Sequence, residues 1–461
     1  MQKISLLLNV LSVFNLCVTA DNNAYKNKIE ILNKNLDSKN VTSILQNILK
    51  KLEERKREAK EATIMVYIAA DNDLHYFAWK NIRELAQVAP ENINIIVQLN
   101  EPGRHKKTQR YLISTGKAYE LNKNSNEKYD SGSAETLIEF CKFSITNFPA
   151  KDYMLILWNH GTGILDPLRR TKNVDEYFQF NPSNLMVEVD RSIGFLDLIE
   201  KQETKGICFD DHFNTYLTNQ KLEKALNEIT QNILGGNKFS IIGMDACLMS
   251  MVEIADLCKK YCHILVASQE VELGAGWRYD KILQFYNSRN LNGFAKHIVQ
   301  AYKEAYESIN SDYTLSAINL DEFQELEENI NQLSLSLIAA INQQSGNSVR
   351  NLIKKSKERI GFDEPNYIDL YSFCDAMAKN IDKCQIQDGQ NTKNNVIKYA
   401  NSCMNSIEKV VIANSTGRNV SFAKGLSIYL PEKNRGIHHS YNKINFAANN
   451  NWINFVSAYI I

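Results

Sequence analysis

A histidine and a cysteine follow two apolar segments that are successive buried strands of the predicted fold. His160 comes just after the segment 153–158 (YMLILW), and Cys247 follows the segment 239–243 (FSIIG). If these strands are neighbours in an open parallel sheet, both side chains lie at the edge where ligands bind. A thiol needs a nearby base to become a nucleophilic thiolate, and an imidazole titrates near neutrality. The pair therefore favours thiol chemistry, with Cys247 as nucleophile and His160 as general base.

Backbone groups beside this pair are suited to stabilise an oxyanion. Gly161 lets a substrate backbone approach and leaves an amide able to donate, together with the amide of Cys247. A helix predicted from about Leu248 to Tyr261 would place Cys247 near a helix N-terminus, which lowers the pKa of a thiol. Position alone leaves a second interpretation open, because a buried cysteine is more often an inert small hydrophobe.

The elements that must position these residues alternate along the chain between apolar strands and amphipathic helices. This pattern predicts an α/β fold with a mostly parallel sheet flanked by helices on both faces. The predicted strands are 63–69, 93–99, 153–158, 239–243 and 263–267, and the predicted helices are 74–89, 133–148, 217–229 and 248–261.

Four regions follow from the changes of pattern along the 461 residues. They are a signal peptide (1–20), a charged helical segment that is a candidate pro-segment (21–61), a catalytic core (62–277) and a helical C-terminal region (278–461), whose late strand at 425–430 is expected to join the core. The first region combines Lys3, a short apolar centre and the small residues Val18-Thr19-Ala20, as secretory signals do. Its apolar run is shorter than the ~20 residues that cross a bilayer. The chain is therefore expected to be exported, whether secreted, periplasmic or extracellular, without stable membrane association after signal removal.

Composition and the absence of certain motifs exclude several classes of function. The 53 basic and 53 acidic residues balance, which argues against an electrostatic nucleic-acid binder. The sequence lacks G-x-G-x-x-G, a Walker A loop and H-E-x-x-H, so nucleotide-dependent and zinc-protease chemistry have no support. Cys258, Cys262 and His263 lack a second ligand pair, and the two cysteines are interpreted as core residues, so no metal site is predicted.

Two motifs around the histidine and the cysteine carry a family resemblance. The segments 159–163 (NHGTG) and 245–249 (DACLM) resemble the signature motifs of the clostripain-like cysteine peptidases, which belong to the caspase-like clan. Further matches appear in order at 69–74 (AADNDL), 209–211 (FDD), 267–270 (ASQE), 276–277 (GW), 369–371 (DLY) and 425–431 (GLSIYLP). Each match alone is weak, but the ordered set over residues 62–461 is specific. The resemblance implies a caspase-like fold and a cysteine endopeptidase that acts on protein or peptide substrates, with His160 as base and Cys247 as nucleophile.

The resemblance also implies cleavage after arginine or lysine. The acidic residue of the DAC motif, Asp245 here, contributes to the pocket for the basic side chain, although a helix N-cap is an alternative role for it. Family members often carry an acid just before the Gly-Trp pair, where this chain has Ala275. Glu270 and Glu272 lie nearby in the sequence and could compensate for the missing acid, but solvated loop positions are the favoured interpretation for both.

Clostripain-like peptidases are commonly self-cleaved between the histidine and the cysteine. Here the stretch 164–205 lies between the motifs, and its part at 164–184 is predicted to be surface loop with little regular structure. Exposed loops are where proteolytic nicking concentrates. The candidate cleavage residues are Arg169, Arg170 and Lys172. An ordinary inserted loop in an already active single chain is the alternative.

Cofactor use and two other functions stay open at this point. No cofactor is required by the predicted chemistry, and calcium dependence, known in the family, is left open; the oxygen-rich segments 71–73 and 210–211 are more commonly loop caps and turns. A catalytically silent caspase-like binding module would not need both His160 and Cys247. Another thiol amidase or acyltransferase on a doubly wound sheet is the third possibility. No residue that orients His160 is identified from the sequence.

Overall fold

A computed structural model describes residues 59–103, 105–165, 178–181, 186–189, 206–286, 289–343, 346–386, 390–433 and 435–461. The signal peptide predicted at 1–20 lies outside the described residues, as does the segment predicted at 21–61 up to residue 58. Among the residues that are described, no helix combines the length and apolarity needed to cross a membrane.

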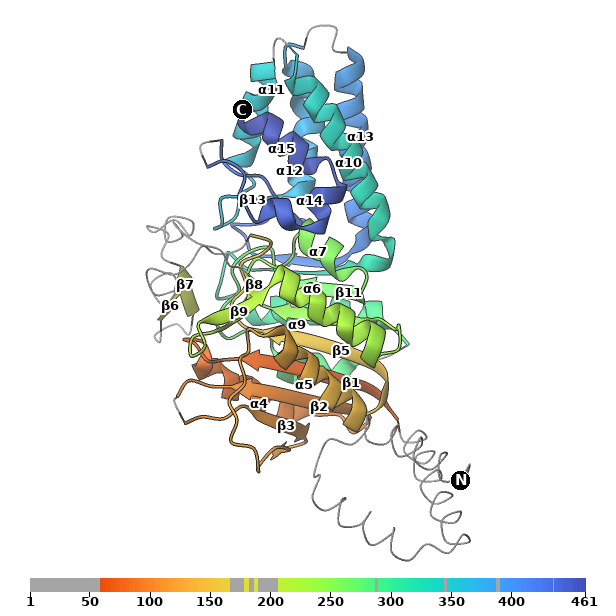
Figure 1. The fold of residues 1–461 in the computed structure, drawn as a ribbon. Helices are drawn as coiled ribbons and strands as arrows, with labels where there is room; N and C mark the ends of the chain where they lie inside the picture. The colour runs from red at the N-terminus through yellow and green to blue at the C-terminus, as the bar shows by residue number, and fades with distance from the viewer. Residues whose placement is uncertain are drawn as a thin grey trace, which may run out of the picture.

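A nine-stranded sheet in the described part of the chain forms the centre of the lower body in Figure 1, in the order β14-β12-β11-β10-β5-β1-β2-β3-β4. The five strands β11, β10, β5, β1 and β2 run parallel, and the strands at both edges are antiparallel. This confirms the predicted α/β class. The bounds are β1 Lys60–Ala69, β2 Ile93–Asn100, β3 Gln109–Ser114, β4 Lys117–Glu120, β5 Ala150–Trp158, β10 Phe239–Asp245, β11 Cys262–Ala267, β12 Thr314–Asn319 and β14 Val411–Thr416.

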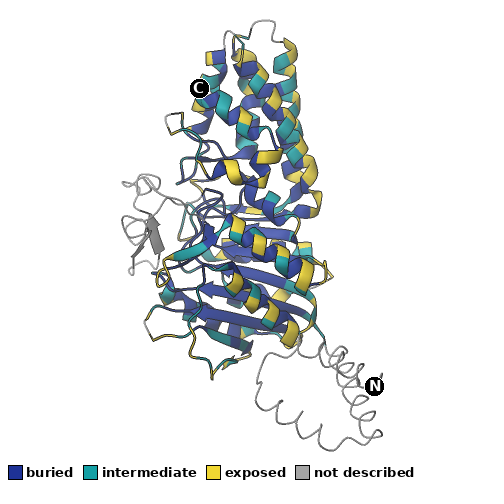
Figure 2. Ribbon diagram, viewed as in Figure 1, coloured by how far each residue is buried: buried dark blue, intermediate teal, exposed yellow. Residues whose placement is uncertain are grey.

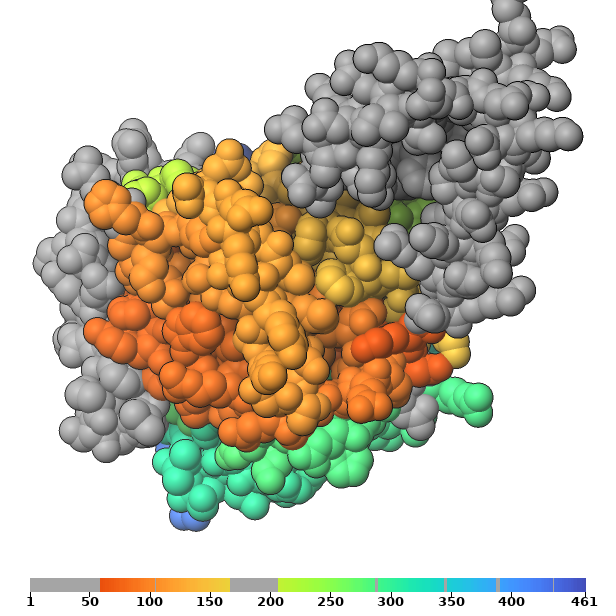
Figure 3. Space-filling view, turned by 90° about the horizontal axis from the view of Figure 1, so that it is seen from below, coloured from red at the N-terminus to blue at the C-terminus, as the bar shows by residue number. Residues whose placement is uncertain are grey.

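Helices on both faces of the sheet explain why its central strands are continuous apolar runs. Every residue of β2 and β10 is buried, and Figure 2 shows the central strands in dark blue. Helices α5 and α6 contact each other in front of the sheet in Figure 1, and the green-to-teal residues that include α8 and α9 cover the opposite side in Figure 3. The helices of this part of the chain are α4 His75–Val88, α5 Ala134–Asn147, α6 Asn219–Glu228, α7 Val252–Cys258, α8 Tyr279–Ile282 and α9 Leu291–Tyr306.

The C-terminal region adds a helical bundle above the sheet in Figure 1 and also completes the sheet itself. Its strands β12 and β14 extend the main sheet beyond β11, so residue 277 is not a boundary of the fold. The late strand predicted at 425–430 is β15 Ser427–Tyr429. It pairs with β13 Tyr367–Asp369 in a separate small sheet and contacts the core through a bridge between Ser427 and Met251. The helices are α10 Phe323–Ile341, α11 Gly346–Lys357, α12 Leu370–Asn380, α13 Gln390–Val410, α14 Asn445–Asn449 and α15 Trp452–Ile460.

Two short antiparallel pairs lie between β5 and β10 in the chain. The first pairs β6 Phe178–Asn181 with β7 Met186–Val189, and the second pairs β8 Gly206–Asp210 with β9 Thr215–Thr218. The expectation of little regular structure at 164–184 is therefore wrong for 178–181, because all four of these residues pair with β7.

Candidate active site

The structure brings His160 and Cys247 to one edge of the sheet. Strands β5 and β10 are parallel neighbours, with Trp158 opposite Asp245, and the amide of Asn159 donates to the Asp245 carbonyl at 3.2 Å. The residues that follow these strands consequently line one small cavity. Its lining residues are Leu74, Trp158, Asn159, His160, Asp245, Ala246, Cys247, Glu272, Leu273, Gly274 and Gly276.

The thiol of Cys247 is enclosed by the backbone of the neighbouring loop. The amide of Glu272 donates to Sγ at 3.3 Å, and Sγ lies 3.9 Å from the carbonyl oxygen of the same residue. Cys247 is only 5% exposed. This burial raises the pKa of the thiol well above its ordinary value, while the amides of Glu272 and Gly161 that face the sulfur act in the opposite direction.

The turn after Cys247 differs from the helix that the sequence predicts. Helix α7 begins at Val252, five residues after Cys247. The intervening backbone is instead bonded to the neighbouring loop, because the amide of Leu248 donates to the Glu270 carbonyl at 3.2 Å and Leu248 itself has φ 62°. The expectation that a helix N-terminus activates the thiol is therefore wrong.

His160 has a carboxylate partner that the sequence analysis did not identify. Its Nε2 lies 2.7 Å from Oδ1 of Asp73, and the two side chains are 3% and 18% exposed. Asp73 follows β1, the strand adjacent to β5 on the side opposite β10. The signal was present in the motif 69–74, whose acidic residues come directly after a buried strand.

Asp245 points into the cavity and does not cap a helix. Its Oδ2 accepts hydrogen bonds from the Tyr279 hydroxyl at 2.8 Å and from the Trp277 amide at 3.2 Å, whereas the N-cap of α7 is Met251. Burial raises the pKa of Asp245 to about 6. Gly276 is required beside it, because a Cβ there would lie 2.8 Å from Oδ2 in a backbone with φ +63°.

Glu270 and Glu272 are both buried, so the interpretation of solvated loop residues is wrong. Glu270 has a structural role, since its carboxylate accepts from the amides of Val271 and Asp363 at 2.8 and 3.1 Å. Glu272 instead lines the cavity with Asp245. Burial, increased by the nearby charge of Asp245, raises the pKa of Glu272 well above its ordinary range.

Gly161 packs too tightly against the cysteine turn to carry a side chain. A Cβ at this position would lie 2.3 Å from the carbonyl oxygen of Cys247 and 2.9 Å from Cγ of Met249. The glycine therefore keeps the backbone after His160 in contact with the backbone around Cys247.

The segments considered for metal binding do not form a metal site in the part of the chain that the structure describes. Within the described ranges no group of three or more His, Cys, Asp or Glu side chains is arranged to hold a metal ion. Asp71 faces the ammonium of Lys128 at 2.5 Å, and Asp210 accepts from the Ser131 amide at 3.0 Å. Cys258 and Cys262 are buried. The cleavage candidates Arg169, Arg170 and Lys172 lie outside the described residues.

Comparisons with known proteins agree with this fold. The model of the Clostripain family matches residues 66–189 and 193–459. Clostripain of Hathewaya histolytica is 23% identical over 482 aligned residues, which cover 90% of this chain and 84% of the relative.

Two solved structures have the same fold at low sequence identity. An inactive protease zymogen of this family from Parabacteroides distasonis superposes with a TM-score of 0.54 at 19% identity, covering 85% of this chain and 98% of its own. A secreted cysteine protease of the family from Bacteroides thetaiotaomicron, bound to an irreversible peptide inhibitor, gives 0.53 at 15% identity, covering 87% and 99%. The predicted caspase-like α/β fold is thus confirmed. Because the family model spans nearly all of the described chain, we conclude that this protein belongs to the clostripain family of cysteine proteases.

Proposed function

We propose that this protein is an exported endopeptidase that cleaves peptide bonds after lysine or arginine by transfer of the acyl group to Cys247 and then to water. The observation that carries the proposal is one cavity that holds a thiol, an imidazole and two buried carboxylates, those of Asp245 and Glu272. The thiol and imidazole supply a nucleophile and a base. The carboxylates supply a site for one cation.

The chemistry follows from the atoms that meet at the edge of the sheet. Cys247 gives its proton to His160, and Sγ attacks the substrate carbonyl carbon to form a tetrahedral oxyanion. The amides of Gly161 and Cys247 are the proposed oxyanion donors. His160 then gives the proton to the leaving amine, and the acyl-enzyme remains. His160 next removes a proton from water, which hydrolyses the thioester and restores the thiol.

The specificity for a basic side chain rests on two neighbouring carboxylates that lack a cation in the described structure. Neither carboxylate oxygen of Glu272 has a well-formed hydrogen bond, although the residue is buried and close to Asp245. A buried carboxylate without a partner is costly, and an ammonium or guanidinium offsets that cost. Glu272 thereby supplies the second acid of the pocket for the basic side chain, in place of the acid that is missing at Ala275.

The cavity is too small in this state for a basic side chain. Its volume is about 20 Å³, which is enough for one water molecule. The segment from Glu272 to Gly276 lines the cavity and also encloses the thiol. Substrate binding must therefore move this segment, and a cut between His160 and Cys247 is the proposed activating event.

Hydrolysis of a peptide library by wild type and by Cys247→Ala tests the proposal. We expect the wild type to prefer lysine or arginine before the scissile bond, and the variant to be inactive with an unchanged circular dichroism spectrum. An apolar or acidic preference contradicts the specificity, and full activity in pure Cys247→Ala contradicts the nucleophile.

A further inference from the structure

The carboxylate of Asp73 occupies one of the two ring nitrogens of His160. Oδ1 of Asp73 lies 2.7 Å from Nε2, and an ionised carboxylate can only accept a hydrogen bond. The imidazole must therefore carry a hydrogen on Nε2. In the neutral ring this leaves the lone pair on Nδ1, which is the form that a general base needs.

The residues on both sides of Asp73 hold its backbone in place. The Asn72 side-chain amide donates to the carbonyls of Ala69 and Phe209 at 2.9 and 3.0 Å, and its Oδ1 accepts from the Leu74 amide at 3.0 Å. These bonds tie the segment to the end of β1 and to β8. Asp73 is consequently positioned by its neighbours as well as by its contact with His160.

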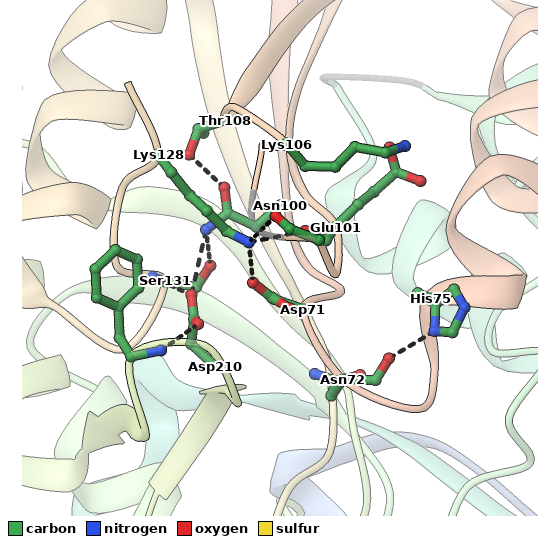
Figure 4. A network of polar contacts seen from close by, with 12 residues as sticks. Asp71, Asn72, His75, Asn100, Glu101, Lys106, Thr108, Lys128, Ser131 and Asp210 are labelled. Carbon is green, nitrogen blue, oxygen red and sulfur yellow. Dashed lines mark hydrogen bonds and ion pairs between the residues drawn. The ribbon is translucent and has the colours of Figure 1, made fainter. Parts of the chain in front are cut away.

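A half-buried lysine fixes the other side of this segment, as Figure 4 shows. The ammonium of Lys128 contacts Oδ2 of Asp71 at 2.5 Å and donates to the carbonyls of Glu101 and Gly103 at 3.1 and 3.2 Å. The Asp71 carbonyl in turn accepts from the Asp211 amide at 2.8 Å. The ammonium of Lys128 thus joins the ends of β1 and β2. Such supporting contacts keep catalytic side chains in the geometry that the reaction needs.

From this geometry we propose that Asp73 is a positioning residue that orients His160 and stabilises the imidazolium formed when Cys247 loses its proton. This inference rests on the proposed function. The proton moves from Sγ of Cys247 to Nδ1 of His160, the Nε2 hydrogen stays bonded to Asp73, and Asp73 remains ionised throughout. A negative charge at hydrogen-bond distance favours the charged form of the ring.

The other titratable side chains that line the cavity are present in the wild type and in variants at Asp73 alike. They are those of Asp245, Cys247 and Glu272. Any difference in pH dependence between the wild type and a variant at Asp73 therefore reports on the carboxylate that contacts His160.

Steady-state kinetics of Asp73→Ala and Asp73→Asn, across pH and with a lysyl peptide, test the inference. We expect Asp73→Ala to lower kcat roughly 10- to 100-fold with little change in KM. Asp73→Asn keeps an oxygen acceptor and should recover part of kcat. Without the negative charge, the acid limb of its kcat/KM profile, where the neutral imidazole forms, should move to lower pH by about 1 to 2 units.

The control and the outcomes separate this inference from the proposed function. Asp375→Asn removes a carboxylate from an ion pair with Lys379 in α12, and its kinetics should match the wild type. An active wild type whose kcat and pH profile are unchanged in both Asp73 variants overturns the inference alone, as does a change confined to KM. A wild type that hydrolyses no peptide contradicts the proposed function and the inference together.

Discussion

Asp245→Asn is expected to stabilise the folded protein and to weaken cleavage after lysine at the same time. The substitution keeps the shape of the side chain, and its carbonyl oxygen can accept both hydrogen bonds that Tyr279 and Trp277 donate to Oδ2. The buried negative charge is lost, and with it the interaction of this carboxylate with the side chain of Glu272. The two effects have opposite signs because that charge is costly in the empty pocket and useful once a cation is bound.

The stability change follows from the raised pKa of Asp245. Its pKa rises from 3.8 to about 6 in the folded state. One pKa unit corresponds to about 1.4 kcal/mol, so the ionised carboxylate lowers the free energy of unfolding by roughly 3 kcal/mol. A native pKa above the unfolded one means that stability is lost as pH rises through that interval. The variant should therefore gain most at neutral pH and little in acid.

The catalytic change follows from the lost contact with the substrate cation. A charge-assisted hydrogen bond contributes about 1.5 to 3 kcal/mol, which corresponds to roughly a 10- to 100-fold fall in kcat/KM for a lysyl peptide. The matched norleucyl peptide, which lacks the ammonium, should change little. For the wild type, the lysine preference should also decline as pH falls through about 6, where Asp245 becomes protonated.

Thermal unfolding and paired kinetics measure both effects, with Asp375→Asn as a control for loss of an exposed carboxylate. The reasoning is refuted if Asp245→Asn lowers the Tm at neutral pH. It is also refuted if kcat/KM falls equally for the lysyl and norleucyl peptides, since Asp245 would then act on the reaction rather than on the basic side chain.

Two further predictions concern activation and stability. Replacing the three candidate cleavage residues by glutamine should keep the chain intact on denaturing gels where the wild type gives two fragments, and a variant still cut in the same place would exclude Arg169, Arg170 and Lys172. Lys128→Met should lower the free energy of unfolding by roughly 3 kcal/mol in urea titrations, because it leaves the buried carboxylate of Asp71 without its cation; an unchanged midpoint would show that this ion pair is not stabilising.

The meeting of His160 and Cys247 was predictable because the pattern around them is local and strong. Each follows a run of mostly apolar residues, and β5 and β10 are hydrogen-bonded parallel neighbours. Only their adjacency had to be assumed. Asp73 follows a similar strand, but its relation to His160 depends on β1 lying on the other side of β5, which the order of strands along the chain does not reveal.

The burial of Glu272 and the residue at which α7 begins could not be predicted from the sequence, for a different reason. Both depend on the loop after β11, which folds back over the cysteine turn and pairs with the backbone of Leu248 and Ser250. These contacts bury a carboxylate that composition assigns to solvent, and they hold Leu248 in a left-handed conformation that interrupts the helical pattern. Non-local backbone pairing overrides local propensity at both places.

The enclosure of the Cys247 sulfur affects how long the protein keeps an intact active-site thiol in the absence of substrate. Peroxides and alkylating agents attack thiolates that solvent can reach, whereas this sulfur is a buried thiol held between backbone groups of Glu272. The resting protein should therefore resist oxidation that would inactivate an open thiol enzyme. Displacement of the Glu272 segment by a substrate ends that protection, so chemical damage should accumulate with turnover rather than with time in storage.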